Sequence, residues 1–262
     1  MNNVVYCFVV LVFFLFSKFS SAGVGDLSQA QLTAIGEQIF RNETGGNDKY
    51  LVAWNDNEDF ASLGIGHFIW FPEGLKSPFT ETFPDLLLHM KSQGISLPEW
   101  LNDNADCPWS SKVEFMSEQA KIQKAELKSL LKSTFSIQLS FITKRMQAAF
   151  NKIAIQLRQD QSDLFKQRYN ALLSSPEGIY SLVDYINFKG EGISPNERYE
   201  NQGWGLQQVL LSMDDNTQQA FTKACKQVLT NRVNNSPQKE KELKWLPGWK
   251  KRCDTYSNKS FN

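Results

Sequence analysis

The sequence lacks an excess of charge of either sign, and it lacks the cysteine and histidine spacings of a metal site. Its 28 Lys and Arg residues balance 28 Asp and Glu residues, so the formal net charge is zero. Proteins that bind nucleic acids usually carry a basic face, and this balance argues against a nucleic-acid partner. No Cys-x-x-Cys or His-rich stretch occurs. We therefore expect neither a zinc site nor any other metal or cofactor.

Long hydrophobic runs are also missing, apart from one near the N-terminus. Residues 4–16 are uncharged and mostly apolar, but a membrane-spanning helix needs about 20 such residues. Small residues at positions 20 and 22 fit a signal-peptidase cut after Ala22. We therefore expect residues 1–22 to be a signal peptide and the mature protein to be periplasmic or secreted, without a stable membrane span. An uncleaved N-terminal anchor is the alternative.

Cysteine is scarce. Cleavage after Ala22 would leave Cys107, Cys225 and Cys253. An odd number allows at most one bridge within the chain. In an oxidising compartment, a Cys225–Cys253 bridge would join two C-terminal helices, but spacing alone leaves the pairing among the three cysteines open.

Neither an internal repeat nor a low-complexity linker divides the chain, so we expect residues 23–262 to form one domain. Residues 111–173 contain no glycine and no proline, and their apolar side chains recur at helical spacing. The pattern predicts an α+β fold that is mainly α. We expect a helix and β-hairpin lobe at about residues 28–72, a helical insertion at 73–176 and a large helical lobe at 177–256, with a cleft between the lobes.

A carboxylate at the end of an amphipathic helix is the first candidate catalytic group. Ser28 and Gln31 have the spacing of a capping box, and apolar residues follow at helical spacing as far as Ile39. Glu43 lies four residues later and should project from the same apolar face. Loss of hydration there favours the neutral form that a general acid needs. The alternative is a glutamate that turns outward into solvent.

An acidic turn between two apolar runs supplies further carboxylates. Residues 50–54 and 60–71 flank a cluster of Asn and Asp, which is typical of a β-hairpin. Asp56 and Glu58 lie at the mouth of this hairpin. Glycoside hydrolysis commonly uses two carboxyl groups that flank the scissile bond, so one of these could be the second. The alternative is a solvated acidic turn.

Five residues are candidates for substrate binding: Glu58, Gly64, Gly66, Gln202 and Trp204. The two glycines at alternate positions would leave one face of the second strand open to a sugar ring. Gln202 and Trp204 lie among amides and glycines, a composition suited to hydrogen bonding and stacking on sugars. A connection between helices, with the tryptophan in the core, explains the same pattern equally well.

The sequence WNDNEDFASLGIGH, residues 54–67, resembles that of the phage-type lysozymes (endolysins). Their pattern is aromatic-x-Asp-x-x-Gly-x-x-Thr-x-Gly-x-Gly-His, and it follows a helix that ends in the catalytic Glu. The resemblance implies that Glu43 is the acid and Asp56 the second carboxylate. It also implies that Ser62 helps to place the attacking water.

The sequence departs from the family pattern at three points. Asp59 stands where the family has Gly, and Ser62 stands where it has Thr, which keeps the hydroxyl. The segment between Glu43 and Asp56 is longer, which moves the second carboxylate away from the bond and leaves Glu58 as the nearest substitute. In the family, the residue matching His67 is a structural ion-pair partner, and we expect the same role here.

The resemblance implies a lysozyme-like fold and a peptidoglycan hydrolase that cleaves the β-1,4 bond between N-acetylmuramic acid and N-acetylglucosamine. We expect a monomer acting on peptidoglycan or a related β-1,4 aminoglycan. Residues 43–46 also look like the Glu-Ser-x-Gly run of goose-type lysozymes and lytic transglycosylases. A lytic transglycosylase, a chitosanase-like enzyme of the same superfamily and a non-catalytic glycan-binding protein are therefore alternatives.

Overall fold

Helices dominate the structure, and a small sheet accompanies them. The computed structural model describes residues 27–56, 58–77, 79–101 and 106–261, so the expected signal peptide lies outside the described residues. Helix makes up 61% of the structure and three strands form an antiparallel sheet, which confirms the prediction of a mainly α member of the α+β class. Within the described ranges, no helix has the length and apolarity needed to cross a membrane.

Helix α1 (Gln29–Thr44) begins and ends where the sequence predicts. The side chain of Ser28 accepts a hydrogen bond from the N–H of Gln31, and the side chain of Gln31 accepts one from the N–H of Ser28. Ile39 is fully buried. Gly45 ends the helix with a φ of 65°, a left-handed conformation that glycine adopts without strain. Glu43 is thereby fixed in the last helical turn.

The sheet contains β1 (Val52–Ala53), β2 (Ala61–Leu63) and β3 (Phe68–Trp70), each antiparallel to the next. The predicted hairpin is confirmed by the pairing of β1 with β2. The prediction of one continuous strand over residues 60–71 is wrong, because the chain reverses between β2 and β3. Gly64 begins this reversal with a φ of 65°.

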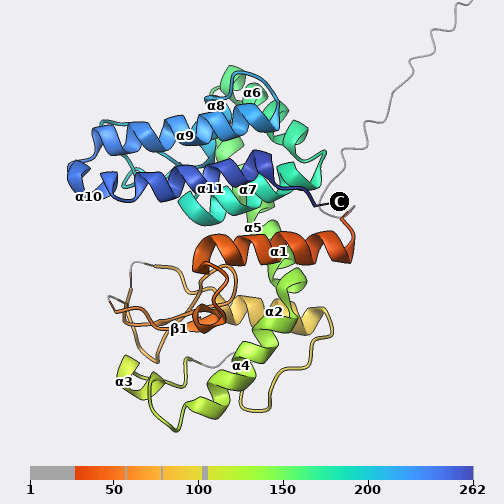
Figure 1. Ribbon diagram of the computed structural model, residues 1–262, viewed down its shortest axis with the longest axis vertical. Coiled ribbons are helices and arrows are strands. Elements are labelled where there is room, and N and C mark those ends of the chain that lie inside the picture. The colour runs from red at the N-terminus through yellow and green to blue at the C-terminus, as the bar shows by residue number, and fades with distance from the viewer. Residues whose placement is uncertain (1–26, 57, 78, 102–105, 262) are drawn as a thin grey trace, which may run out of the picture.

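Short helices surround the sheet and complete what we call the small lobe, residues 48–133 (Figure 1). Its core is aromatic: the ring of Trp70 lies 4.8 Å from that of Phe83 and 6.0 Å from that of Trp109, measured between centroids. The helices of this lobe are η2 (Asp48–Leu51), α2 (Phe83–Ser92), α3 (Lys112–Phe115) and α4 (Lys121–Ser133).

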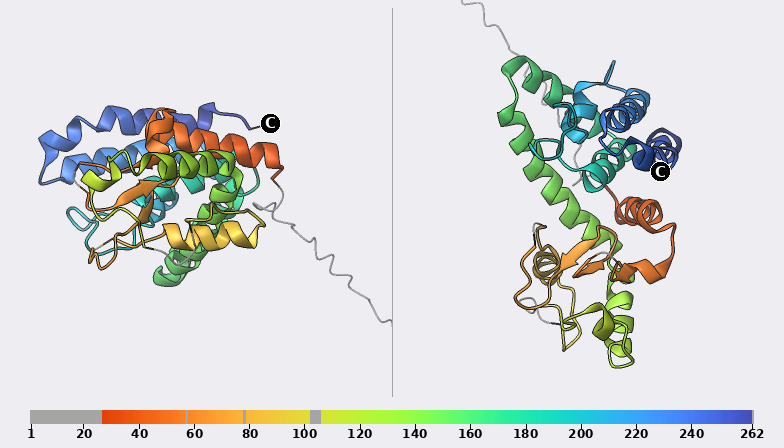
Figure 2. Two further views of the ribbon diagram at one scale, coloured as in Figure 1. Left: turned by 90° about the horizontal axis from the view of Figure 1, so that it is seen from below. Right: turned by 90° about the vertical axis from the view of Figure 1, so that its left-hand side faces the viewer.

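Helix α5 (Phe135–Gln156) runs from the small lobe to the large lobe, as the right-hand view of Figure 2 shows. It packs against α1 and α2 and also against α6 (Gln159–Leu172). The segment 73–176 is therefore not one insertion on one side of a cleft. It is divided, with α2 to α4 in the small lobe, α6 in the large lobe and α5 joining them.

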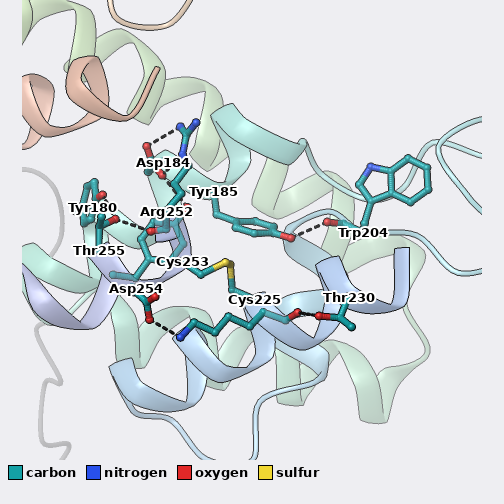
Figure 3. The surroundings of a disulfide bond; sticks show 12 residues. Tyr180, Asp184, Tyr185, Trp204, Cys225, Thr230, Arg252, Cys253, Asp254 and Thr255 are labelled. Atoms are coloured by element: carbon teal, nitrogen blue, oxygen red, sulfur yellow. Dashed lines mark hydrogen bonds and ion pairs between the residues drawn. A yellow bond between two sulfur atoms is a disulfide. The ribbon is translucent and has the colours of Figure 1, made fainter. Parts of the chain in front are cut away.

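The large lobe, residues 159–261, consists of helices and the loops that join them, of which residues 190–205 are the longest (Figure 1). Residues 181–185 of α7 are all buried, as expected for a helix that is apolar on nearly every side. A disulfide joins Cys225 to Cys253 (Figure 3), which is the bridge that the sequence made plausible while leaving the pairing open, and Cys107 is buried and free. Besides α6, the helices are α7 (Pro176–Lys189), α8 (Leu206–Leu211), α9 (Gln218–Asn235), α10 (Lys239–Leu243) and α11 (Leu246–Asn258).

Candidate active site

Glu43 faces a pocket between α1 and the sheet, which we call the Glu43 pocket. Its side chain is 15% exposed, so the prediction that it projects from the buried face of the helix is confirmed. The pocket has a volume of about 290 Å³. Its lining comes from α1, η2, the hairpin and the turn before β3. The described residues that line it are Glu43, Thr44, Tyr50, Ala53, Asn55, Ser62 and His67.

Two side chains of the large lobe bind Glu43. Nη2 of Arg252 donates to Oε1 of Glu43 at 2.6 Å, and Nδ2 of Asn187 donates to the same oxygen at 3.2 Å. Arg252 comes from α11 and Asn187 from the last turn of α7. Among the described residues, both hydrogen bonds go to Oε1, which leaves Oε2 of Glu43 for the pocket.

Asp184 holds Arg252 from the other side. Nε of Arg252 donates to Oδ2 of Asp184 and Nη2 donates to Oδ1, both at 2.8 Å (Figure 3). Asp184 is fully buried and also accepts hydrogen bonds from Tyr256 Oη at 2.7 Å and Asn42 Nδ2 at 3.2 Å. Buried charges persist only when paired and hydrogen-bonded, and this carboxylate fixes the guanidinium beside Glu43.

Arg252 reverses the expected charge state of Glu43. Burial acts to raise the pKa of Glu43, but the charge and hydrogen bond of Arg252 outweigh it, and His67 and Asn187 act in the same direction. The pKa therefore lies below its ordinary value. The prediction of a neutral acid in the free protein is wrong, because helical spacing reveals the apolar face of α1 but not a cation from α11. Glu43 is a carboxylate at neutral pH.

Asp56 lies outside the Glu43 pocket. Its side chain is 93% exposed and pairs with Lys112 of α3, a hydrogen bond that lowers the pKa of Asp56. It is not among the described residues that line the pocket. Its surroundings match the solvated-turn alternative, and the structure does not bring Asp56 and Glu43 together.

On the hairpin side of the pocket, the hydroxyl of Ser62 is hydrogen-bonded to the carboxylate of Glu58. Ser62 lies on β2, is 4% exposed and donates its hydroxyl proton to Oε2 of Glu58 at 3.0 Å. Nδ2 of Asn55 donates to the same oxygen at 2.8 Å. Because Oγ of Ser62 has only one proton to donate, its lone pairs remain free to accept a hydrogen bond from water in the pocket. Glu58 can thus act on such a water through one hydroxyl.

Gly64 and Gly66 make room for protein atoms. A Cβ at Gly64 would collide with Oε1 of Gln138, which accepts a hydrogen bond from the N–H of Ile65 at 3.0 Å. A Cβ at Gly66 would lie 2.8 Å from the ring of Phe68. The close approach at Gly64 is therefore made by α5 and β3 and not by a ligand, whereas Gly66 also lines a second pocket, described below.

Gln202 and Trp204 are not among the described residues that line the Glu43 pocket. Trp204 is 8% exposed, and the guanidinium of Arg232 lies 4.1 Å from its ring centroid. Trp204 is therefore part of the core, which was the alternative to a sugar-binding role. Gln202 is exposed and lines a separate surface pocket with Asn201 and Gly203.

His67 is exposed and lines two neighbouring pockets. It has a left-handed backbone, with a φ of 49°. In the described ranges it forms no ion pair, so the expected structural ion pair is not seen. Its electrostatic effect falls on Glu43, whose pKa it helps to lower.

Sequence reasoning misses three residues of the site: Arg252, Asp184 and Asn187. Asp184 is the one charged residue of the apolar stretch 179–188. A lone acid in a buried helix needs a partner, and that need is a signal of an ion pair. Arg252 gives no such signal because it follows two lysines in a basic run.

The chemistry available in this site is that of carboxylates, a hydroxyl and fixed cations. Within the part of the chain that the structure describes, no group of three or more His, Cys, Asp or Glu side chains could hold a metal ion. Comparison of the chain with protein-family models, curated proteins and solved structures finds no match.

Proposed function

We propose that the protein is a glycoside hydrolase of lysozyme-like fold that cleaves the β-1,4 bond between N-acetylmuramic acid and N-acetylglucosamine in peptidoglycan. One observation carries the proposal. Glu43 from a helix and Ser62 from the hairpin line the same pocket, and Ser62 is hydrogen-bonded to Glu58. One carboxyl group therefore lines the pocket and a second reaches it through the Ser62 hydroxyl, and a pair of carboxyl groups is what glycoside hydrolysis commonly uses. The resemblance of residues 54–67 to phage-type lysozymes points the same way.

In this proposal Glu43 is the general acid and Glu58 is the base. Protonated Oε2 of Glu43 gives its proton to the glycosidic oxygen. Glu58 accepts a proton from water through Ser62, and the water attacks the opposite face of the sugar. Because Arg252 keeps Glu43 ionised in the free protein, its acid form becomes populated as the pH falls. We therefore expect activity to rise on the acidic side of neutrality.

The expected location supports a cell-wall substrate. The Cys225–Cys253 disulfide is typical of proteins in oxidising compartments, which include the periplasm and the extracellular space. We accordingly propose a periplasmic or secreted enzyme.

Digestion of purified peptidoglycan tests the proposal. Wild type should release reducing ends, and Glu43→Gln should lower the rate by about 10²–10⁴-fold. Glu58→Gln should lower it by more than about tenfold, while the matched control Asp56→Asn should stay within about twofold, because Asp56 forms only an exposed ion pair. No product from wild type at any pH between about 4 and 8 would remove the enzyme function. Loss in Asp56→Asn but not in Glu58→Gln would reverse the roles given to these two carboxylates.

The Glu43–Arg252 ion pair favours a second candidate, a glycan-binding protein without turnover. A lowered pKa opposes general acid catalysis but does not oppose binding. Wild type that binds peptidoglycan and releases no fragments would identify this function. Because Asp56 lies outside the pocket, a lytic transglycosylase that depends on Glu43 alone is also compatible, and 1,6-anhydro ends in mass spectra would identify it.

A further inference from the structure

A second pocket adjoins the Glu43 pocket, and we call it the Arg145 pocket. It has a volume of about 360 Å³. His67 lines both pockets, and Asn187, which donates to Glu43, lines the second. A chain of sugars that places a bond at Glu43 therefore has its next ring at the Arg145 pocket. In the proposed hydrolase, this pocket is a subsite beside the scissile bond.

The wall of the Arg145 pocket carries an uncompensated positive charge. Arg145 and Lys152 lie seven positions apart on α5, so they project from one face of the helix. Nζ of Lys152 pairs with Oε1 of Glu191 at 3.5 Å, and Glu191 is the acidic residue that lines this pocket. Arg145 is exposed, and among the described residues it forms no ion pair and no hydrogen bond. Its guanidinium is thus left for a ligand.

Apart from Glu191, whose carboxylate is paired with Lys152, the rest of the polar lining offers hydrogen-bond donors. Besides Arg145, the pocket presents the amide of Asn187, the ring of His67 and the hydroxyl of Thr80. Carboxylates accept hydrogen bonds and do not donate them, and a guanidinium binds a carboxylate with two parallel bonds. The pocket therefore suits a sugar with a carboxylate-bearing substituent better than a neutral or cationic one.

We propose that the Arg145 pocket binds the acidic substituent of the sugar next to the scissile bond, with Arg145 as its partner. This inference rests on the proposed function and narrows its substrate to glycans that carry carboxylates. In peptidoglycan, the carboxylate is either the lactyl group of muramic acid, in strands without peptides, or a carboxylate of the attached peptide. Chitin oligosaccharides lack both.

The preference of the enzyme for acidic over neutral glycans tests whether Arg145 recognises a carboxylate. kcat/KM is determined for peptide-free glycan strands, peptide-bearing glycan strands and a chitin hexasaccharide. Arg145→Gln should lower the ratio of acidic to neutral substrate by about tenfold to a hundredfold, and Arg145→Lys should restore part of it. The control Arg158→Gln, which removes an exposed arginine paired with Asp160, should keep the wild-type ratio. A wild-type ratio in Arg145→Gln overturns the inference and leaves the proposed function standing.

The pattern of loss identifies the source of the carboxylate. Loss on peptide-free strands assigns Arg145 to the lactyl group, whereas loss confined to peptide-bearing strands assigns it to the peptide. Both results support the inference.

Binding tests the inference even where no cleavage occurs. The probes are the disaccharide of N-acetylglucosamine and N-acetylmuramic acid and the same disaccharide with its carboxyl group reduced to an alcohol. Wild type should bind the acid at least about tenfold more tightly than the alcohol, and Arg145→Gln should bind both equally. Equal binding of both by wild type overturns the inference, whereas absence of cleavage with unequal binding counts only against the hydrolase.

Discussion

Glu43 and Arg252 form an ion pair of 2.6 Å between the last turn of α1 and the middle of α11, across 209 positions of sequence. The same guanidinium is bound by the buried carboxylate of Asp184. The charge of the candidate acid therefore depends on how the C-terminal helix packs, and it can be changed without altering Glu43 itself.

Removing this cation should shift the pH dependence of activity. The double variant Arg252→Met with Asp184→Asn removes both charges of the Arg252–Asp184 pair, so burial becomes the main influence on Glu43. Burial raises a carboxyl pKa, so the acid form should persist to higher pH. We expect the profile of kcat/KM against pH to move upward by about 1–3 pH units. A profile equal to that of wild type would contradict the role given to Arg252.

The Glu43–Arg252 ion pair should also contribute to the free energy of unfolding, and this contribution should depend on pH. The pKa of Glu43 is lowered in the folded state from an ordinary value of 4.5, so its contribution is fully present above pH 4.5 and is lost as the pH falls through the lowered folded-state pKa. At pH 7, Glu43→Gln should reduce the free energy of unfolding by about 1–3 kcal/mol, and the reduction should shrink at pH 3. Urea unfolding at both values measures it. Glu37→Gln, in an exposed pair with Arg41, should change stability by less than about 1 kcal/mol.

Lys189 should also make stability depend on pH, but here the charged form is destabilised by burial and not stabilised by a partner. Its Nζ lies 4.1 Å from the ring centroid of Phe188 and 3.8 Å from that of Trp249, and burial lowers its pKa from 10.5 to about 7. Between these values the unfolded chain holds a proton that the folded protein has released, so stability rises with pH across this window. Lys189→Met should therefore stabilise the protein most below pH 7 and progressively less toward pH 10. Melting temperatures at pH 6 and 9 test this, and an equal gain at both would refute it.

The disulfide should stabilise the helix that presents Arg252. Cys225 and Cys253 are 28 positions apart. Reduction of a disulfide that closes a loop of this length should lower the free energy of unfolding by about 3–4 kcal/mol. Unfolding of wild type in urea, with and without a reductant, measures the loss. The reductant should not affect the double variant Cys225→Ser with Cys253→Ser. An equal response of both proteins would assign the effect to something other than this bridge.

Gly64 should tolerate alanine poorly. Its φ of 65° strains any side chain, and a Cβ would also collide with Gln138. We expect Gly64→Ala to cost more than about 3 kcal/mol, because the clash adds to backbone strain of about 1–3 kcal/mol. Gly94 is the matched control, since its φ is 76° but nothing lies within 4 Å of an added Cβ. Equal destabilisation of the two variants would show that the contact with Gln138 contributes nothing.

Local signals made α1 predictable from the sequence, and the hairpin partly so. The cap at Ser28, the helical spacing and Gly45 act within a few residues of one another, so they can be read along the chain. The reversal at Gly64 was missed because apolar residues on both sides of a turn resemble one strand. Glu43 could be located for the same local reason. Its partner Arg252 could not, because their contact arises only when α1, α7 and α11 pack together.

Helix α5 connects the two lobes as a continuous rod of 22 residues without glycine or proline (Figure 2). Sharp bending of a helix usually needs a proline, a glycine or a break in its hydrogen-bond ladder. The same rod carries Gln138 against the sheet and Arg145 at the neighbouring pocket. Because α5 offers no such bending point within its length, a change in the distance between the two lobes has to come from its ends, at Thr134 and Leu157.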